Sequence, residues 1–448
     1  MGAVFGGRIQ HISREPQVTE ERVQSSWTFR IVAFLLLFVA FVPHRFIYSF
    51  DSGITGRIAG LVPLVPVAVC AVLLCGVVFT RPRGRDGISS QVMLSIAVWI
   101  GIVTVGGLGS KEPAYALIRD VYYFLTGAAL VFICRQALLQ RHEQSVRVLV
   151  LAGALIGAYC VYEFATGTRP LLGQVFSQDN LRYSLFASDD FGRRVLGTVG
   201  HPVYLGTFFA LVVPFTLWLC YNENGIRLVT PVVALVCVSS GLLLTFSRGA
   251  WFAAAVASFV YLRGRSRRQI WIAAGALTVV LSAAFSIDRV WKTLESRGTL
   301  GQIQAFKRDE RGMAYAQATS ILMMQPLVGV GTGQYRFAAP LVGDYNHTPD
   351  NMYLRMLSEN GIAGMSGFAF VIASIVYPLH RAITAVSRRS RESDMGLAVI
   401  AGLTGFLADM LTCDALYFPL TRICFWIVAG LGVTIAITLR QSLGEDPS

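Results

Sequence analysis

Long runs of apolar residues recur along most of the chain, separated by shorter polar segments. A helix that spans a bilayer needs about 20 mostly apolar residues, because its backbone polar groups must pair within the helix where no water is present. Twelve runs approach this length, near residues 31–48, 58–80, 92–109, 115–134, 148–164, 203–221, 228–246, 250–262, 270–287, 362–379, 397–416 and 420–439. The eighth is short and can also be one half of a re-entrant pair with the seventh. The pattern predicts an all-α, polytopic integral membrane protein with about twelve transmembrane helices.

Composition agrees with a membrane location. Of 448 residues, 54% are hydrophobic and only 14% are charged, whereas soluble domains average about 45–50% and about 25%. The 28 Phe, 16 Tyr and 7 Trp exclude a disordered chain, which would be poor in large apolar residues. All eight cysteines lie within or at the edge of apolar runs, which argues against a disulfide framework and a zinc site. We expect no metal and no cofactor.

The distribution of arginine predicts the orientation of the helices. If the N-terminus is inside, the cytoplasmic segments hold about twenty arginines, whereas the short external loops hold only Arg45, Arg57 and Lys111. Cytoplasmic connections are enriched in Lys and Arg, so we expect both termini in the cytoplasm and an even number of spans. The formal net charge of +12 is then a signal of topology and of attraction to anionic lipids, and it does not indicate a nucleic-acid partner.

Two connections are too long to be simple turns, and both are predicted on the external face. The predicted organisation is a cytoplasmic tail of residues 1–30, nine helices within 31–287 that include an external loop of 165–202, a large external loop of 288–361, three helices within 362–439, and a cytoplasmic tail of 440–448. Function is common in such loops. Their basic residues suggest an anionic ligand outside; the alternative is that long translocated loops ignore the charge bias.

Two motifs place arginines at helix entries. The sequence RRVLGTVGHP, from Arg193 to Pro202, leads into the sixth run. Its glycines allow a close approach of the backbone to a ligand, and Arg193 and Arg194 can bind phosphate oxygens. The sequence SRGAW, from Ser247 to Trp251, places Arg248 between two apolar runs, where a cation is costly unless it meets a partner or a water-filled cavity. The alternative for these arginines is an interfacial role, with the charged ends reaching toward water.

The large external loop contains a predicted helix followed by a glycine-rich turn. Residues 311–325 have helical periodicity, which places Arg311 at the start of a helix that stops before Pro326. The turn that follows reads GVGTG, over residues 329–333. It is a poor dinucleotide fingerprint, because no strand precedes it and the third glycine is misplaced. We expect a loop that bends sharply beside a ligand.

A short helix over residues 352–360, closed by Gly361, is predicted after the sequence HTPDN of residues 347–351. Thr348 as the N-cap and Pro349 at the first helical position fit the usual start of a helix. An acid such as Asp350 is also favoured there by the helix dipole alone. The functional interpretation places His347, Asp350 and Asn351 together at a helix N-terminus, where either His347 or Asp350 could take a proton from a hydroxyl group.

Other charged residues lie near the external ends of predicted helices. They are Arg119, Asp120, Asp409, Asp414 and Arg422. Mutual ion pairing inside the bundle explains them without any catalytic role, and we expect that.

The order of these motifs resembles the superfamily of O-antigen ligases and polymerases. The chain shows R-x-x-G-T-x-G-x-P entering a helix, then S-R-G-A-W, then R-x(14)-P-L-x-G-x-G-x-G in a long external loop, then D-N-x(9)-G-x-x-G. The resemblance covers roughly residues 190–370.

The resemblance implies a GT-C-like, metal-independent and inverting glycosyltransferase at the periplasmic face of the bacterial inner membrane. Its donor would be a glycan linked to undecaprenyl diphosphate, and its acceptor lipid A-core oligosaccharide or a related glycan. Arg194 and Arg248 would hold the donor diphosphate, with Arg193 and Arg311 as further candidates. Preorganised guanidinium groups suit a diphosphate leaving group on which charge develops.

One position departs from the pattern of this superfamily. Ligases typically have a histidine as the base ahead of the short helix, whereas here Asp350 occupies that place and His347 lies one turn earlier. Asp350 is favoured by register and His347 is its rival, with Asn351 beside them. A lipid A-core acceptor would make a ligase, another lipid-linked chain a polymerase, and a protein hydroxyl an O-oligosaccharyltransferase. A lipid or polysaccharide transporter is the alternative from another class, although no repeat relates the two halves.

Overall fold

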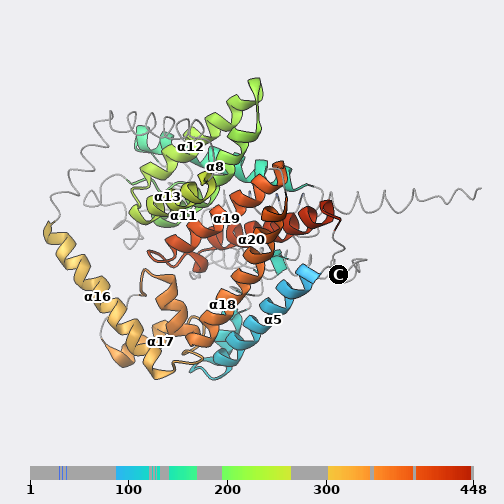
Figure 1. Cartoon of the computed structure of the whole chain (residues 1–448). Helices are drawn as coiled ribbons and strands as arrows, with labels where there is room; N and C mark the ends of the chain where they lie inside the picture. Colours follow the sequence, from blue (N-terminus) through green and yellow to red (C-terminus); the bar gives the residue numbers. More distant parts are fainter. Residues whose placement is uncertain are drawn as a thin grey trace, which may run out of the picture.

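The computed structural model describes residues 30, 33, 37, 87–120, 124, 127, 129–131, 141–168, 194–263, 301–343, 348–386 and 390–444. Regular secondary structure within these residues is helical throughout, and Figure 1 shows the helices gathered in one bundle. The predicted runs 31–48, 58–80 and 270–287 lie wholly or mostly outside the described residues. An all-helical fold is thus confirmed for the described part of the chain.

The described helices follow one another as α5 (Gly87–Leu108), α6 (Pro113–Asp120), α8 (His142–Thr166), α11 (Pro202–Asn222), η3 (Gly225–Leu228), α12 (Val229–Leu244), α13 (Arg248–Leu262), α16 (Gly301–Met324), α17 (Tyr335–Val342), α18 (Met352–Ala385), α19 (Arg391–Asp409), η4 (Ala415–Tyr417) and α20 (Pro419–Ser442).

Two helices, α11 and α20, form the centre of the bundle. The spanning part of α20 is buried along its whole length, and that of α11 over most of it. Both are apolar on all sides, as is typical of a helix enclosed by others. Each has a proline in its first turn, Pro202 or Pro419, where the missing N–H group costs nothing. Around this centre α19 packs against α11, α13 and α20, while α8 packs against α12 and α5 against α18 (Figure 1).

Glycines let neighbouring helices approach closely. A Cβ atom on Gly157 of α8 would lie 2.2 Å from the carbonyl oxygen of Cys237 in α12. A Cβ atom on Gly405 of α19 would lie 2.8 Å from the carbonyl oxygen of Ala253 in α13. Interfaces between membrane helices are rich in small residues for this reason.

Six segments of the described chain are long and apolar enough to cross a membrane. They are α5, α8, α11, the segment Gly225–Leu244 that joins η3 and α12, α18 and α20, and the shorter α13 is also apolar. These match predicted runs in position, which confirms a polytopic membrane protein. The count of twelve spans stays a prediction.

Two predicted boundaries are wrong. The eleventh run was expected to continue to residue 416, but α19 ends at Asp409 and the chain then turns, because the amides of Thr412 and Cys413 both bond back to the carbonyl of Asp409. The short helix after the large loop starts at Met352, so Thr348 is not its N-cap. Asn351 is, since its side chain accepts the Leu354 amide at 3.1 Å.

An ion-pair cluster joins three helices at the end of the bundle opposite the start of α11. The buried carboxylate of Glu223, after α11, accepts hydrogen bonds from Arg147 of α8 and from Arg391 of α19, the latter at 2.9 Å. Arg391 also pairs with Glu143 at 2.7 Å. Burial alone would raise the pKa of Glu223, but the two arginines outweigh it and hold that pKa below its ordinary value.

The sign of this shift predicts a pH effect. The pKa of Glu223 is lower in the folded protein than in the unfolded chain. The ion pairs therefore stabilise the fold at pH values above the ordinary glutamate pKa of about 4.3, and this stabilisation is lost as the pH falls through the folded pKa. We expect Glu223→Gln to lower the melting temperature of the purified protein by roughly 2 °C at pH 7. At a pH below the folded pKa of Glu223 the substitution should have no effect. A difference between the two melting temperatures that did not shrink on acidification would contradict this role.

Candidate active site

Two candidate arginines meet at the turn between α12 and α13. The Nε and Nη2 atoms of Arg194 donate to the carbonyl oxygens of Thr245 and Phe246, each at 3.0 Å. Phe246 adopts a left-handed backbone, with φ of 49°, which bends the chain sharply before α13 begins. Arg248 is the first residue of α13, and its side chain is exposed. Arg194 therefore braces the same turn that presents Arg248.

The loop from Arg194 to the start of α11 is held by a residue that sequence reasoning missed. Both carboxylate oxygens of Glu163, near the end of α8, accept backbone amides of the loop, from Leu196 at 3.1 Å and from Gly197 at 2.9 Å. Gly197 and Gly200 adopt φ of 58° and 78°, a region that favours glycine. The signal in the sequence was an isolated acid in an apolar run, which is costly unless it has partners.

His201 precedes α11 and is buried. Its ring packs at a tilt against that of Tyr204, with 4.6 Å between centroids. Burial lowers the pKa of His201 to about 4; Asp414 opposes this shift and Arg194 adds to it. His201 is thus neutral at physiological pH.

The end of α19 touches the beginnings of both α13 and α18. A Cβ atom on Gly249, in the first turn of α13, would lie 2.0 Å from the hydroxyl oxygen of Thr412 and 3.0 Å from a carboxylate oxygen of Asp409. The backbone amide of Met352 donates to the carbonyl of Met410 at 2.8 Å. The SRGAW and DN motifs, about one hundred residues apart in the chain, are therefore joined through one turn.

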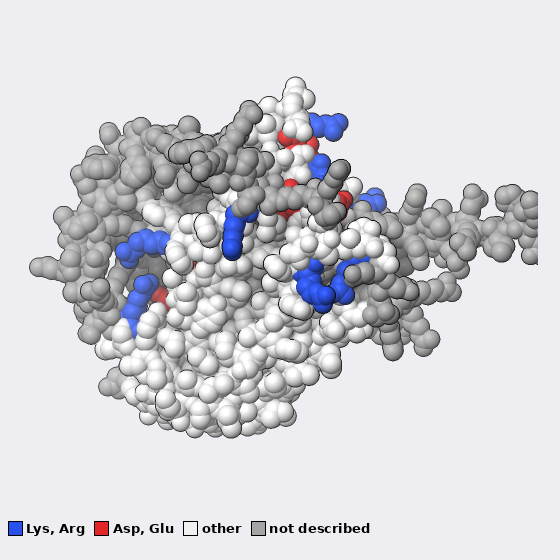
Figure 2. Space-filling model, in the orientation of Figure 1, with Lys and Arg blue, Asp and Glu red and all other residues white. Residues whose placement is uncertain are grey.

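Asp350 and Asn351 lie at this N-terminus of α18, as predicted. An Nη2 atom of Arg311 in α16 lies 3.5 Å from a carboxylate oxygen of Asp350, and both side chains are more than half exposed. Figure 2 shows a hollow at the left of the view in which basic groups lie beside an acidic one. Arg193 and His347 lie outside the described residues. The structure thus brings Arg194 and Arg248 together at one turn, and Arg311 together with Asp350 and Asn351.

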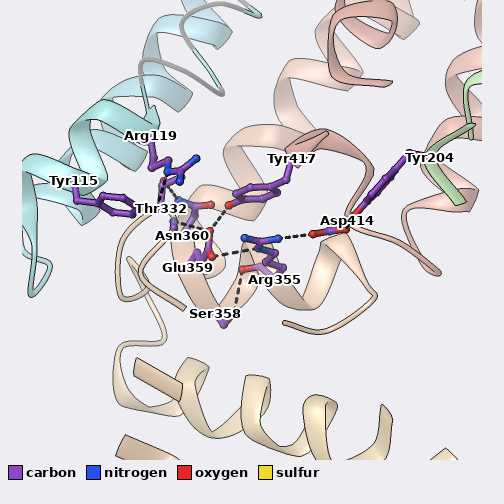
Figure 3. Close-up of polar contacts among 11 residues, drawn as sticks. Tyr115, Arg119, Tyr204, Thr332, Arg355, Ser358, Glu359, Asn360, Asp414 and Tyr417 are labelled. Atoms are coloured by element: carbon purple, nitrogen blue, oxygen red, sulfur yellow. Dashed lines mark hydrogen bonds and ion pairs between the residues drawn. The ribbon is translucent and has the colours of Figure 1, made fainter. Parts of the chain in front are cut away.

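A network of buried polar side chains begins in the first turn of α18. Arg355, in the first turn of α18, pairs with Asp414 after α19 and, at 3.3 Å, with Glu359. The hydroxyl of Tyr204 in α11 donates to Asp414, and that of Tyr417 in η4 donates to Glu359. The guanidinium carbon of Arg355 also lies 3.8 Å from the ring centroid of Tyr417. Figure 3 shows this chain of contacts running from Tyr204 through Arg355 to Glu359.

The glycine-rich turn wraps around the kink of α18. All three of its glycines have positive φ, and the Gly333 amide donates to Glu359 Oε2 at 2.8 Å. The side chain of Asn360 donates to the Thr332 hydroxyl at 2.8 Å. Gly361 breaks the helix with φ of 68°, and a Cβ atom there would lie 2.3 Å from the carbonyl oxygen of Leu327. The predicted sharp bend is present, and side chains of the short helix hold it.

Two of the charged residues expected to pair with one another, Asp409 and Asp414, bind other residues. Asp414 pairs with Arg355, and Asp409 accepts the hydroxyls of Thr207 at 2.5 Å and Thr412 at 2.9 Å. Sequence reasoning missed this role of Arg355. Within the described residues, no group of three or more His, Cys, Asp and Glu is arranged to hold a metal ion.

Comparison with known proteins adds one finding. Residues 233–369 match the family model described as O-antigen ligase, and no curated protein sequence matches the chain. The matched segment begins within α12, contains Arg248, Arg311, Asp350 and Asn351, and ends within α18. It confirms the predicted resemblance over this segment, and the motif of residues 193–202 lies outside it.

The network predicts a large effect of removing its central cation. We expect Arg355→Ala to destabilise the protein by about 3–5 kcal/mol, because it leaves the carboxylates of Glu359 and Asp414 buried without their cation. Thermal unfolding in detergent measures this. Tyr417→Phe, which removes one hydroxyl and keeps the ring, is the milder matched variant. Equal melting temperatures for Arg355→Ala and wild type would show that the network does not hold the site.

Proposed function

We propose that this protein is a membrane glycosyltransferase that moves a glycan from undecaprenyl diphosphate onto an acceptor hydroxyl. The match of residues 233–369 to the O-antigen ligase family supports this proposal. The acceptor is the lipid A-core oligosaccharide or a related glycan. The reaction needs no metal and inverts the anomeric centre.

The observation that carries this proposal is the convergence of two arginines on one turn beside the DN motif. Arg194 braces the turn through two carbonyl groups, and Arg248 projects from it at the start of α13. A diphosphate leaving group gains negative charge as its bond to the sugar breaks. Fixed guanidinium groups stabilise that charge without reorganising during the reaction.

Asp350 is the proposed base. Its exposed carboxylate lies on the helix start that contacts the turn after α19, and Arg311 stands beside it. In the proposed step Asp350 takes the proton of the acceptor hydroxyl, and the hydroxyl oxygen bonds to the anomeric carbon. The bond to the diphosphate breaks and the diphosphate leaves with the electron pair. His347 is the rival for the same proton, and Arg193 adds a further cation for the donor.

The proposed topology has twelve spans, both termini in the cytoplasm, and this site on the periplasmic face of the bacterial inner membrane. The starts of α11, α13, α18 and α20 and the ends of α12 and α19 carry the site. Arg147, Arg227, Arg381, Arg391 and Arg440 lie near the opposite ends of their helices. Arg227 and Arg391 lie in or beside short connections, where the preference for cytoplasmic Lys and Arg applies, and this supports the proposed orientation. We also propose the predicted division into helices 31–287, loop 288–361 and helices 362–439.

A polymerase of the same superfamily is the second candidate. The observation that favours it is the aspartate at the position where ligases typically carry histidine, because an altered base is compatible with an altered acceptor.

The arginines can be tested in cells that lack their own ligase. We expect Arg248→Ala to reduce transfer at least about 100-fold with normal membrane insertion, since loss of one preorganised donor costs 10²–10³ in rate. Arg194→Lys keeps the charge, but a lysine cannot donate to both carbonyl groups in the geometry of the guanidinium. We therefore expect reduced transfer in this variant too. Capped lipopolysaccharide on gels is the measurement, and exposed Arg381→Ala is the control. Full activity in both site variants would refute the diphosphate assignment.

The base and the acceptor are tested in a paired experiment. Asp350→Asn should abolish transfer while His347→Gln retains it, and the reverse result would make His347 the base. The same chain is introduced into cells that lack a ligase and into cells that lack a polymerase. Capped lipid A-core in the first strain identifies a ligase, whereas elongation of lipid-linked units in the second identifies a polymerase. No rescue in either strain would contradict both acceptors.

A further inference from the structure

A second basic cluster lies beside the glycine-rich turn. Arg119 of α6 and Arg336 of α17 both stack on Tyr115, with guanidinium carbons 4.9 Å and 4.5 Å from its ring centroid. Arg336 also lies 4.6 Å from the ring centroid of Phe337, and Arg119 Nε donates to the Tyr115 hydroxyl at 2.8 Å. Figure 3 shows Tyr115 and Arg119 next to Thr332, at the opposite end of the polar contacts from Tyr204. The cluster is therefore separate from Arg194 and Arg248.

The glycine-rich turn fixes this cluster in place. A Cβ atom on Gly333 would lie 3.1 Å from both the Tyr115 ring and Arg119 Cγ, so the turn packs directly on these side chains. The side chain of Gln334 donates to the carbonyl oxygen of Glu112 at 2.9 Å, which ties the turn to the start of α6. Since the same turn is bonded to the kink of α18, the cluster and the candidate active site share one rigid support.

The charge balance of the cluster is positive. The two guanidinium carbons lie less than about 10 Å apart, because both are within 5 Å of one ring centroid. The connection between α5 and α6 adds an exposed cation, Lys111, and an exposed acid, Glu112, and Asp120, the residue after Arg119, is a buried acid. Cations so gathered repel one another, and the proposed topology puts them on the face that membrane proteins usually leave poor in Lys and Arg. A bound anion would offset both costs.

We propose that Arg119 and Arg336, oriented by Tyr115 and Phe337, form a binding subsite for a phosphate or carboxylate group carried by the acceptor saccharide. This inference rests on the proposed function. An oligosaccharide is long enough to be held by an anionic group at one place while its hydroxyl reaches Asp350 at another, and binding energy at such a remote position helps to orient the reacting group. Guanidinium groups are suited to phosphate and carboxylate because they can bind two oxygens at once.

A saccharide is the favoured source of the anion because Arg336 belongs to α17. This helix lies in the connection between α16 and α18 and is not among the candidate spans. An anionic phospholipid headgroup has the same phosphate chemistry, so the experiment must separate the two.

The test uses the full-length protein in neutral phosphatidylcholine nanodiscs. The probes are a phosphorylated oligosaccharide and the same oligosaccharide after dephosphorylation, and their binding is measured by thermophoresis. We expect Arg119→Ala and Arg336→Ala each to weaken binding of the phosphorylated probe about tenfold, as loss of a charge-assisted hydrogen bond predicts, and to leave binding of the neutral probe unchanged. Arg336→Lys should recover part of the loss, and Arg381→Ala should have no effect.

Three other outcomes would contradict either this proposal or the proposed function on which it rests. Equal binding of the phosphorylated probe to wild type and both variants would refute the subsite. If the variants change only the response of transfer to added anionic phosphatidylglycerol, the occupant is a lipid headgroup and the saccharide assignment is wrong. Transfer from the lipid-linked donor is measured in parallel. Normal probe discrimination without any transfer would contradict the proposed function while leaving the subsite intact.

Discussion

A single guanidinium buried between two carboxylates holds the candidate active site together. Arg355 lies almost out of solvent between Glu359 and Asp414, and each carboxylate receives a tyrosine hydroxyl from another part of the bundle. Charges in such surroundings are costly unless every member has its partners. The first turn of α18, the turn after α19, α11 and the glycine-rich turn must all be in place for that to hold. The polar network therefore specifies how these connections sit against one another.

The groups proposed to carry the chemistry lie outside this buried network. Arg248, Arg311 and Asp350 are exposed, and each belongs to a helix start or helix that the interior contacts fix. Water and substrates can thus reach them, while the backbone beneath them stays rigid. Such an arrangement suits catalysis by positioning and electrostatics, since a preorganised site does not have to reorganise when charge develops.

The sequence predicted those features that depend on local rules. Apolar run length located the candidate spans of the described residues, and the glycine at the predicted end of the short helix located the kink at Gly361. The N-cap was placed wrongly at Thr348, because Asn351 also satisfies the capping rule and tertiary contact with Met410 selects it. The roles of Glu163 and Glu359 were missed. Apart from Arg355, which lies four residues before Glu359, their partners are distant in sequence. An acid within an apolar segment indicates that a partner exists without saying which one.

Direct visualisation of a bound donor is the most immediate test of the central claim that the turn between α12 and α13, which Arg194 braces and which presents Arg248, holds the donor diphosphate. A cryo-electron microscopy structure with a non-transferable undecaprenyl-diphosphate sugar would locate the two phosphates. The account predicts both phosphates at the turn between α12 and α13, within hydrogen-bonding distance of the Arg248 guanidinium and with Arg194 bracing that turn. Phosphates bound elsewhere, with no contact to this turn, would contradict it.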